Sequence, residues 1–204
     1  MSNFLFILRC YSGFEQSLIK NKWCPSGATT IVKTLEYIQN DNSSNLLLIS
    51  SKYNSKLDFI RNKKLNLKKL NIPVHCIMGK LSILSNSKLG ILYTNIYNSF
   101  SIIYYVLKFR PKIIYSDHAN IFVTAFISRY MRIKTVVRLM GIKDDMRECL
   151  NGNSLYSRLL KWSYRSPFSM VIATQDGAGS DVWMDQALRK KVPRKTILNG
   201  VDRK

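Results

Sequence analysis

Residues 112–141, KIIYSDHANIFVTAFISRYMRIKTVVRLMG, decide the fold of this chain. Two short apolar runs within it, 113–115 and 135–139, have the length and composition of buried strands. Between them, residues 119–132 are apolar almost all round, which predicts a well-buried helix. Two strands joined by one helix form a parallel, right-handed crossover unit.

The residues directly after these two strands mark the expected functional edge. The first strand stops at Asp117-His118 and the second at Met140-Gly141. Ligands of open parallel sheets bind just beyond the carboxyl ends of the strands. We therefore expect a ligand close to these four residues.

The rest of the chain continues the alternation of strands and helices. Further strands are predicted at 3–8, 46–49, 73–78, 170–173 and 196–198. Helices are predicted at 29–39, 56–69, 89–110, 155–165 and 179–190, with a polar loop or short helix at 141–152. The stretch before the first helix holds Gly13, Pro25 and Gly27 and is expected to be a loop. This order predicts an α/β fold: a Rossmann-like, doubly wound, mainly parallel sheet of about seven strands with helices on both faces.

One segment, 89–107, is apolar enough to raise the alternative of a membrane span. A span needs about 20 mostly apolar residues. This segment carries five polar residues, Thr94, Asn95, Asn98, Ser99 and Ser101. We therefore expect a helix packed on the sheet.

The charge of the chain indicates an anionic partner. The 204 residues include 32 Lys+Arg and 12 Asp+Glu, a formal net charge of +20. Residues 42–116 carry twelve of the cations and a single acid, Asp58. Such a field favours nucleic acid, an acidic membrane leaflet or a phosphorylated substrate. A compositional bias of the source genome is the alternative explanation.

The four cysteines favour a reducing compartment. They are widely separated and lack the spacing of a zinc site or a disulfide framework. We expect free thiols in a cytoplasmic protein.

Three stretches resemble one enzyme family, glycosyltransferase family 4, which has the GT-B fold. Residues 23–38, WCPSGATTIVKTLEYI, are similar to its first glycine-rich turn and the helix that follows. Residues 110–126, RPKIIYSDHANIFVTAF, look like its fourth strand and next helix. Residues 195–202, KTILNGVD, are similar to the end of its N-terminal domain.

The resemblance implies a division of the protein and an activity. Residues 1–198 would be the Rossmann-like N-terminal half of a GT-B architecture, and 199–204 the start of an interdomain linker. The C-terminal, donor-binding domain would be absent, so this fragment alone is expected to be inactive. The full-length enzyme would transfer a sugar from a nucleotide-sugar donor to a glycan or lipid-linked acceptor, with retention, in surface polysaccharide biosynthesis.

The resemblance also implies an enzyme without a cofactor, because the nucleotide-diphosphate sugar is a substrate. No metal is expected. The adjacent acids Asp144 and Asp145 have no further ligands beside them in the sequence and are expected at the surface.

The predicted donor-phosphate site is the start of the helix at 29. The amides of Gly27, Ala28 and Thr29 and the positive end of the helix dipole favour a phosphate there. The structural alternative is a plain helix N-terminus capped by Ser26.

The predicted catalytic residue is His118, whose imidazole can donate to a sugar hydroxyl or phosphate, or move a proton. The alternative is a histidine bonded to neighbouring backbone. Arg138 and Gly141 are predicted to bind the acceptor. The guanidinium of Arg138 can donate two hydrogen bonds to one phosphate group. Alternatively, Arg138 pairs at the sheet edge with Asp144 or Asp145. His75 is expected to be structural.

Two further predictions concern the surroundings of the enzyme. Six cations are predicted to hold it on the anionic inner face of the plasma membrane: Lys56, Arg61, Lys63, Lys64, Lys68 and Lys69. The alternative is a solvated helix face. Asn199 and Gly200 are predicted to form the hinge between domains, or else an ordinary turn.

The competing class is a basic nucleic-acid-binding module. Its evidence is the charge, together with four tyrosines that could stack on bases: Tyr93, Tyr97, Tyr104 and Tyr105. Their helical spacing in an apolar segment predicts core positions instead, and no nucleic-acid-binding motif is present. An inactive truncated transferase is the third possibility.

Overall fold

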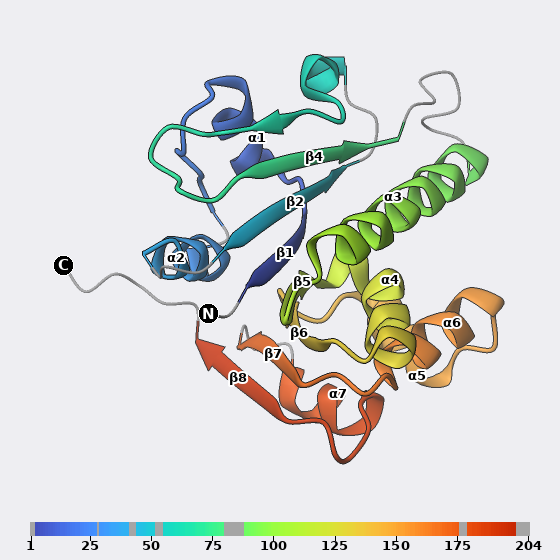
Figure 1. The fold of residues 1–204 in the computed structure, drawn as a ribbon. Coiled ribbons are helices and arrows are strands. Elements are labelled where there is room, and N and C mark those ends of the chain that lie inside the picture. Colours follow the sequence, from blue (N-terminus) through green and yellow to red (C-terminus); the bar gives the residue numbers. More distant parts are fainter. Residues whose placement is uncertain are drawn as a thin grey trace. The chain divides into compact units, whose positions relative to one another are not determined.

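The computed structural model describes residues 3–27, 29–40, 44–51, 55–79, 88–175 and 179–198 (Figure 1). The contacts of the chain group its residues into two compact units, Met1–Pro111 and Lys112–Lys204, called unit 1 and unit 2 below. Each unit contributes four strands and is described by itself.

Unit 1 is built on three parallel strands, β1 (Phe4–Arg9), β2 (Asn45–Ser51) and β4 (Val74–Met78). A two-residue strand, β3 (Lys64–Leu65), pairs antiparallel with β4, so the strand order is β3-β4-β2-β1. Residues 5–8 and 47–49 are almost inaccessible to solvent. Continuous apolar runs of this kind are typical of parallel strands covered on both faces.

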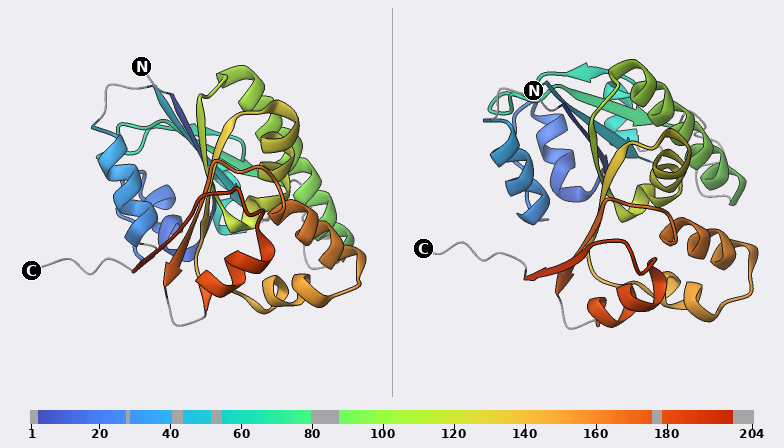
Figure 2. Two further views of the ribbon diagram at one scale, coloured as in Figure 1. Left: turned by 90° about the horizontal axis from the view of Figure 1, so that it is seen from below. Right: turned by 60° about the horizontal axis from the view of Figure 1, so that its bottom comes forward.

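Helices cover both faces of unit 1 (Figure 2). The helices α1 (Ser12–Ile19) and α2 (Thr29–Ile38) lie on one face, and α3 (Lys88–Phe109) lies on the other. Buried Ile31 and Leu35, four residues apart, turn one side of α2 to the core.

In unit 2, consecutive strands are neighbours and every pair is parallel: β5 (Ile113–Asp117), β6 (Lys134–Leu139), β7 (Met170–Gln175) and β8 (Arg194–Leu198). The helical segments are η2 (His118–Asn120), α4 (Ile121–Phe126), η3 (Ile127–Met131), α5 (Asp144–Asn151), α6 (Leu155–Tyr164) and α7 (Ser180–Ala187). Their apolar side chains form one core with Val137, Leu139, Val171 and Ala173 of the strands. One face of β6 and β7 is therefore covered by helices (Figure 2).

The predicted fold class is confirmed, because the structure is a Rossmann-like α/β fold with mainly parallel strands. The described residues form eight strands, and the short β3 is the one that the sequence did not predict. Residues 112–141 form the expected crossover, although the helix between its strands divides into a 3-10 turn, an α-helix and a π-helical turn. The long segment from residue 89 is helix α3, which packs on β4 and β2. None of the described helices combines the length and apolarity needed to cross a membrane.

The predicted basic helix at 56–69 is wrong. A 3-10 turn, η1 (Ser55–Ile60), is followed by Asn62 in the left-handed region (φ 53) and then by β3. Lys69 is also left-handed (φ 71). Pairing of Lys64-Leu65 with the edge of β4 replaces the helix that the local sequence favours, which is tertiary structure overriding local propensity.

The stretch expected to be a loop contains helix α1. Gly13, interpreted as a helix breaker, lies in its first turn.

Candidate functional site

The carboxyl ends of β5 and β6 meet at one edge of unit 2. Asp117 pairs in register with Arg138, so the residues that follow, His118 and Met140-Gly141, lie at the same edge. Gly141 is buried with φ 82, a conformation that glycine adopts without a steric penalty. The structure thus brings together the predicted residues of unit 2 in the region that the sequence indicated.

A side-chain hydrogen bond holds the ring of His118. Its Nδ1 lies 2.7 Å from the hydroxyl of Tyr164, the last residue of α6, and the two rings are parallel within 3°. Tyr164 is only 1% exposed and packs edge-on against Trp183, with ring centroids 4.7 Å apart. Trp183 is fixed in turn by its Nε1, which donates to the Met146 carbonyl over 2.7 Å.

The alternative prediction for His118 was a hydrogen bond to neighbouring backbone, and the structure gives it a side-chain partner. The partner is a side chain 46 residues away, and the histidine is half-buried at the strand end. Burial, followed by nearby Cys149 and Asp145, raises the pKa of Tyr164 well above its ordinary value. The hydroxyl therefore stays protonated, and the catalytic role of His118 stays a prediction.

The turn that carries His118 rests on buried polar contacts. Asn120 Nδ2 donates to Asp117 Oδ1 over 2.8 Å, and Thr124 Oγ1 donates to Ser116 Oγ over 2.8 Å. All four side chains are buried. Satisfied buried networks of this kind fix a single local geometry.

Arg138 points away from the helices, since Val137 and Leu139 beside it face the helical core. Arg138 is 1% exposed, and its guanidinium donates to Thr174 Oγ1 over 2.7 Å. Burial lowers the pKa of this arginine below its ordinary value. Acceptor binding by Arg138 stays a prediction, and it would require the guanidinium to become accessible.

The acids Asp144 and Asp145 form the first turn of α5. Asp145 accepts from the Met146 amide over 3.0 Å and from the Tyr156 hydroxyl over 3.5 Å. Within the described ranges, no three His, Cys, Asp or Glu side chains are grouped as metal ligands.

The predicted donor-phosphate residues belong to unit 1. Gly27 is exposed, has φ 69 and has open space where a Cβ would point. The Tyr11 hydroxyl donates to its carbonyl over 3.4 Å. Thr29 begins α2, whereas Ala28 lies outside the described residues. The phosphate role of this turn stays a prediction.

Gly13 supports this turn, a role that sequence reasoning missed. A Cβ on Gly13 would lie 1.7 Å from the carbonyl oxygen of Ser26 and 2.4 Å from the ring of Tyr11. The Ser26 amide donates to the Gly13 carbonyl over 3.2 Å. Only glycine lets the first turn of α1 touch the loop in front of α2, so the pair of glycines at 13 and 27 was the available signal.

Replacing Gly13 by alanine is expected to destabilise unit 1 by about 1–3 kcal/mol, because the backbone must move to relieve the clash. The matched control is Gly27→Ala, whose new methyl group meets no atom and suffers only the cost of positive φ, about 1–2 kcal/mol. Urea unfolding measures the free energy of each variant. Proton–nitrogen NMR of the amides of Trp23, Cys24 and Ser26 should show shifts at all three residues only for Gly13→Ala. Unshifted amides of Trp23, Cys24 and Ser26 in Gly13→Ala would contradict this account.

The six predicted membrane cations do not share one helix face. Lys63, Lys64, Lys68 and Lys69 are exposed, Lys56 belongs to η1, and Arg61 is paired with Asp58. The hinge residues Asn199 and Gly200 lie outside the described residues. Membrane binding by these cations stays a prediction, with four exposed members in an irregular segment.

The outer side of α3 carries an exposed apolar stripe. We call these residues the α3 stripe: Leu92, Tyr93, Ile96, Phe100, Tyr104 and Leu107. The interpretation of Tyr93 and Tyr104 as core is therefore wrong, since 38% and 57% of their surfaces are exposed. Because α3 packs on the sheet with one side only, its outer side stays exposed.

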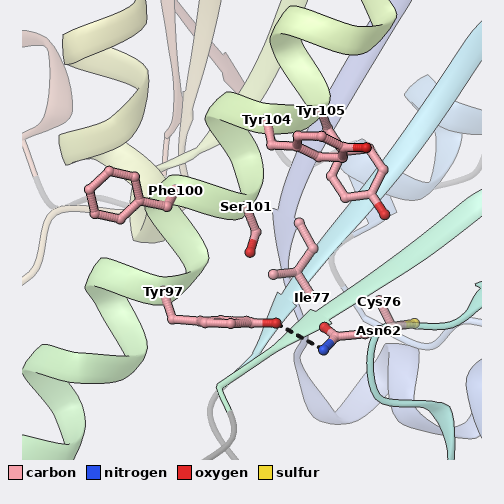
Figure 3. A pocket seen from close by; sticks show the side chains of 8 residues that line it. All are labelled: Asn62, Cys76, Ile77, Tyr97, Phe100, Ser101, Tyr104 and Tyr105. Carbon is pink, nitrogen blue, oxygen red and sulfur yellow. Dashed lines mark hydrogen bonds between the residues drawn. The ribbon is translucent and has the colours of Figure 1, made fainter.

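A pocket of about 430 Å³ opens between α3 and β4 (Figure 3). Its lining consists of Asn62, Cys76, Ile77, Tyr97, Phe100, Ser101, Tyr104 and Tyr105. Asn62 Nδ2 donates to the Tyr97 hydroxyl over 2.9 Å across one end of it. Two members of the α3 stripe thus continue into a hollow with polar groups at its edge.

Comparisons with known proteins agree with the fold. No protein-family model matches the chain, and no curated protein does. Sucrose-phosphate synthase from Thermosynechococcus elongatus aligns with a TM-score of 0.62 at 8% identity, over 99% of this chain and 49% of its own. Arabidopsis thaliana UGT89C1, complexed with UDP-L-rhamnose, aligns with a TM-score of 0.55 at 10% identity, over 99% and 53%. UDP-GlcNAc 2-epimerase from Neisseria meningitidis, bound to UDP-GlcNAc, gives 0.51 at 12% identity, over 97% and 46%.

These neighbours are glycosyltransferases of the GT-B fold and a nucleotide-sugar epimerase. The chain has the fold of the N-terminal half of such proteins and spans about half of their length. At these identities the likeness shows the fold alone, so membership of glycosyltransferase family 4 stays a prediction.

Proposed function

We propose that the protein is a nucleotide-sugar-dependent glycosyltransferase and that this chain is its acceptor-side half. The observation that carries the proposal is a histidine at the carboxyl end of β5, held by Tyr164, in a GT-B-type half. The neighbours with bound UDP-L-rhamnose and UDP-GlcNAc support a nucleotide-sugar donor. Family resemblance adds retention of configuration and surface polysaccharide as the product.

In this mechanism, the diphosphate leaving group binds at the start of α2, beside Gly27. Hydrogen-bond donors and the helix dipole stabilise the charge that develops as the glycosidic bond to the diphosphate breaks. The acceptor lies over the strand ends near His118 and Gly141. Closure of the donor-binding half over this edge would exclude water and limit hydrolysis of the donor. The chain without that half is expected not to turn over.

The test is a transfer assay on the full-length protein with a panel of radiolabelled nucleotide sugars and membrane extracts as acceptor. Label in a glycan or lipid-linked product supports the proposal, and its anomeric configuration decides between retention and inversion. Absence of transfer and of donor hydrolysis across the whole panel would overturn it.

We also propose that the enzyme works at the cytoplasmic face of the plasma membrane, through the α3 stripe and the exposed lysines. Asn62, which lines the pocket, directly precedes Lys63 and Lys64, and Lys108 Nζ lies 5.7 Å from the ring centroid of Tyr104. Apolar side chains bordered by cations match an anionic bilayer, which accepts the former among acyl chains and the latter at its head groups.

Replacing Leu92, Ile96 and Phe100 together by serine is expected to weaken binding to vesicles with 30% phosphatidylglycerol about tenfold. The matched control replaces three exposed apolar residues of other helices, Leu155, Leu159 and Val182. Cosedimentation measures binding, and pure phosphatidylcholine vesicles should bind neither protein. Equal loss in the two variants would exclude the α3 stripe as the contact.

The nucleic-acid alternative is favoured by one observation, the exposure of Tyr93 and Tyr104 beside a cationic surface. Filter binding at two salt concentrations separates the classes. Steeply salt-dependent affinity for unrelated oligonucleotides, with no affinity for anionic vesicles, would favour the module.

A further inference from the structure

Both histidines of the chain contact a tyrosine hydroxyl through Nδ1. His75 lies 2.8 Å from Tyr105 in unit 1, and His118 lies 2.7 Å from Tyr164 in unit 2. In the first pair, His75 lies within β4 and Tyr105 belongs to α3, where it also lines the open pocket of Figure 3. The second pair sits at a strand end, and its tyrosine is buried.

The burial of Tyr164 restricts where the protons can be. A tyrosine hydroxyl has one proton to donate, and a neutral imidazole carries one N–H. Among the described residues, the Tyr164 hydroxyl bonds to His118 Nδ1 and to no other atom. If Nδ1 carried the proton, the buried hydroxyl proton would lack an acceptor, which is costly away from water.

We propose that Tyr164 is a positioning residue that keeps His118 in the tautomer with its proton on Nε2. The hydroxyl donates to Nδ1, so the neutral imidazole carries its proton on Nε2, which is then a donor and not a base. This N–H suits a hydroxyl or phosphate oxygen of the acceptor, a choice of ligand that rests on the proposed function. The assignment of the tautomer does not.

The surroundings of Tyr164 fit a positioning role. Its ring packs against Trp183, whose own N–H is bonded, so the hydroxyl has little freedom to move. Burial raises the pKa of Tyr164, so its hydroxyl is protonated and can donate at neutral pH. The pair at Tyr105 lacks such enclosure, because water in the open pocket can accept its proton.

The test is a long-range proton–nitrogen NMR spectrum of the chain labelled with [15N]histidine, at a pH where the imidazoles are neutral. With two histidines, the variant His75→Gln assigns the signals. We expect an unprotonated Nδ1 and a protonated Nε2 for His118, and a slowly exchanging Tyr164 hydroxyl proton close to its ring. A protonated Nδ1 in the native chain would overturn the proposal.

Tyr164→Phe removes only the hydroxyl. It is expected to abolish the slow hydroxyl signal and to let a population with protonated Nδ1 appear, while Tyr105→Phe changes the signals of His75 alone. An unchanged His118 spectrum in a folded Tyr164→Phe chain would also overturn the proposal. If that variant fails to fold, the hydroxyl proton and the tautomer of the native chain decide the matter.

The two proposals fail separately. In the full-length protein, Tyr164→Phe is expected to lower kcat about ten- to a hundredfold with little change in KM, as for other side chains that orient an imidazole. Native His118 with the expected tautomer, but no transfer with any nucleotide sugar, would end the proposed function and keep the positioning. Transfer at an unchanged rate in Tyr164→Phe would end the positioning role and keep the proposed function.

Discussion

His118→Ala is expected to lower kcat/KM for sugar transfer about 10²–10⁴-fold, the range found when a positioned acid–base or hydrogen-bonding side chain is removed. The imidazole lies at the carboxyl end of β5, where ligands of parallel sheets bind, and is held at 2.7 Å by a buried side chain. The loss should appear mainly in kcat, because an oriented donor acts most strongly on the charge of the transition state. The loss is measured from initial rates of the full-length protein over a range of nucleotide-sugar concentrations.

The matched control is His75→Ala. That histidine also contacts a tyrosine hydroxyl, but it lies inside β4, and burial together with Lys64 and Lys108 lowers its pKa. Activity of His75→Ala within about twofold of the native protein is expected, since one mid-strand hydrogen bond contributes about 1 kcal/mol to stability. Full activity of His118→Ala would remove the histidine from the mechanism.

Trp183→Ala is expected to cost about 3–5 kcal/mol of the free energy of unfolding of unit 2. The indole is 4% exposed, supports Tyr164 edge-on and donates to the Met146 carbonyl. Its removal leaves a cavity and takes the stronger of two side-chain donors from the Met146 carbonyl, which also accepts from Cys149 Sγ. Urea unfolding followed by near-ultraviolet circular dichroism measures the loss.

Trp162→Ala is the control from the same unit. Trp162 is 37% exposed, and the guanidinium of Arg129 lies 4.6 Å from its ring centroid. An exposed cation–π pair contributes about 0.5–1 kcal/mol. Similar losses for the two tryptophans would mean that Trp183 does not anchor the core beneath His118.

The strands, and therefore the edge at which a ligand is predicted, could be located because their signals are local. Residues 5–8 and 47–49 are apolar without interruption, since parallel strands are covered on both faces. The position of His118 followed from the end of such a run. These features require no knowledge of which distant residues come together.

What the sequence hid depends on contacts between distant residues. Tyr164 lies 46 residues after His118, to which it is hydrogen-bonded. The sequence around Tyr164 does not distinguish it from other tyrosines. Gly13 was misinterpreted because its reason is a close approach to Ser26. The pairing of Lys64-Leu65 with β4 likewise overrode a helical pattern of leucines and lysines.

The short strand β3 has a consequence for solubility. Without β3, the outer edge of β4 would present unpaired backbone N–H and C=O groups to other chains. Such edges promote amyloid-like stacking. Two residues of antiparallel backbone occupy part of that row, and Lys63 and Lys64 place charge beside it. We therefore expect the lysines of this segment to limit aggregation as well.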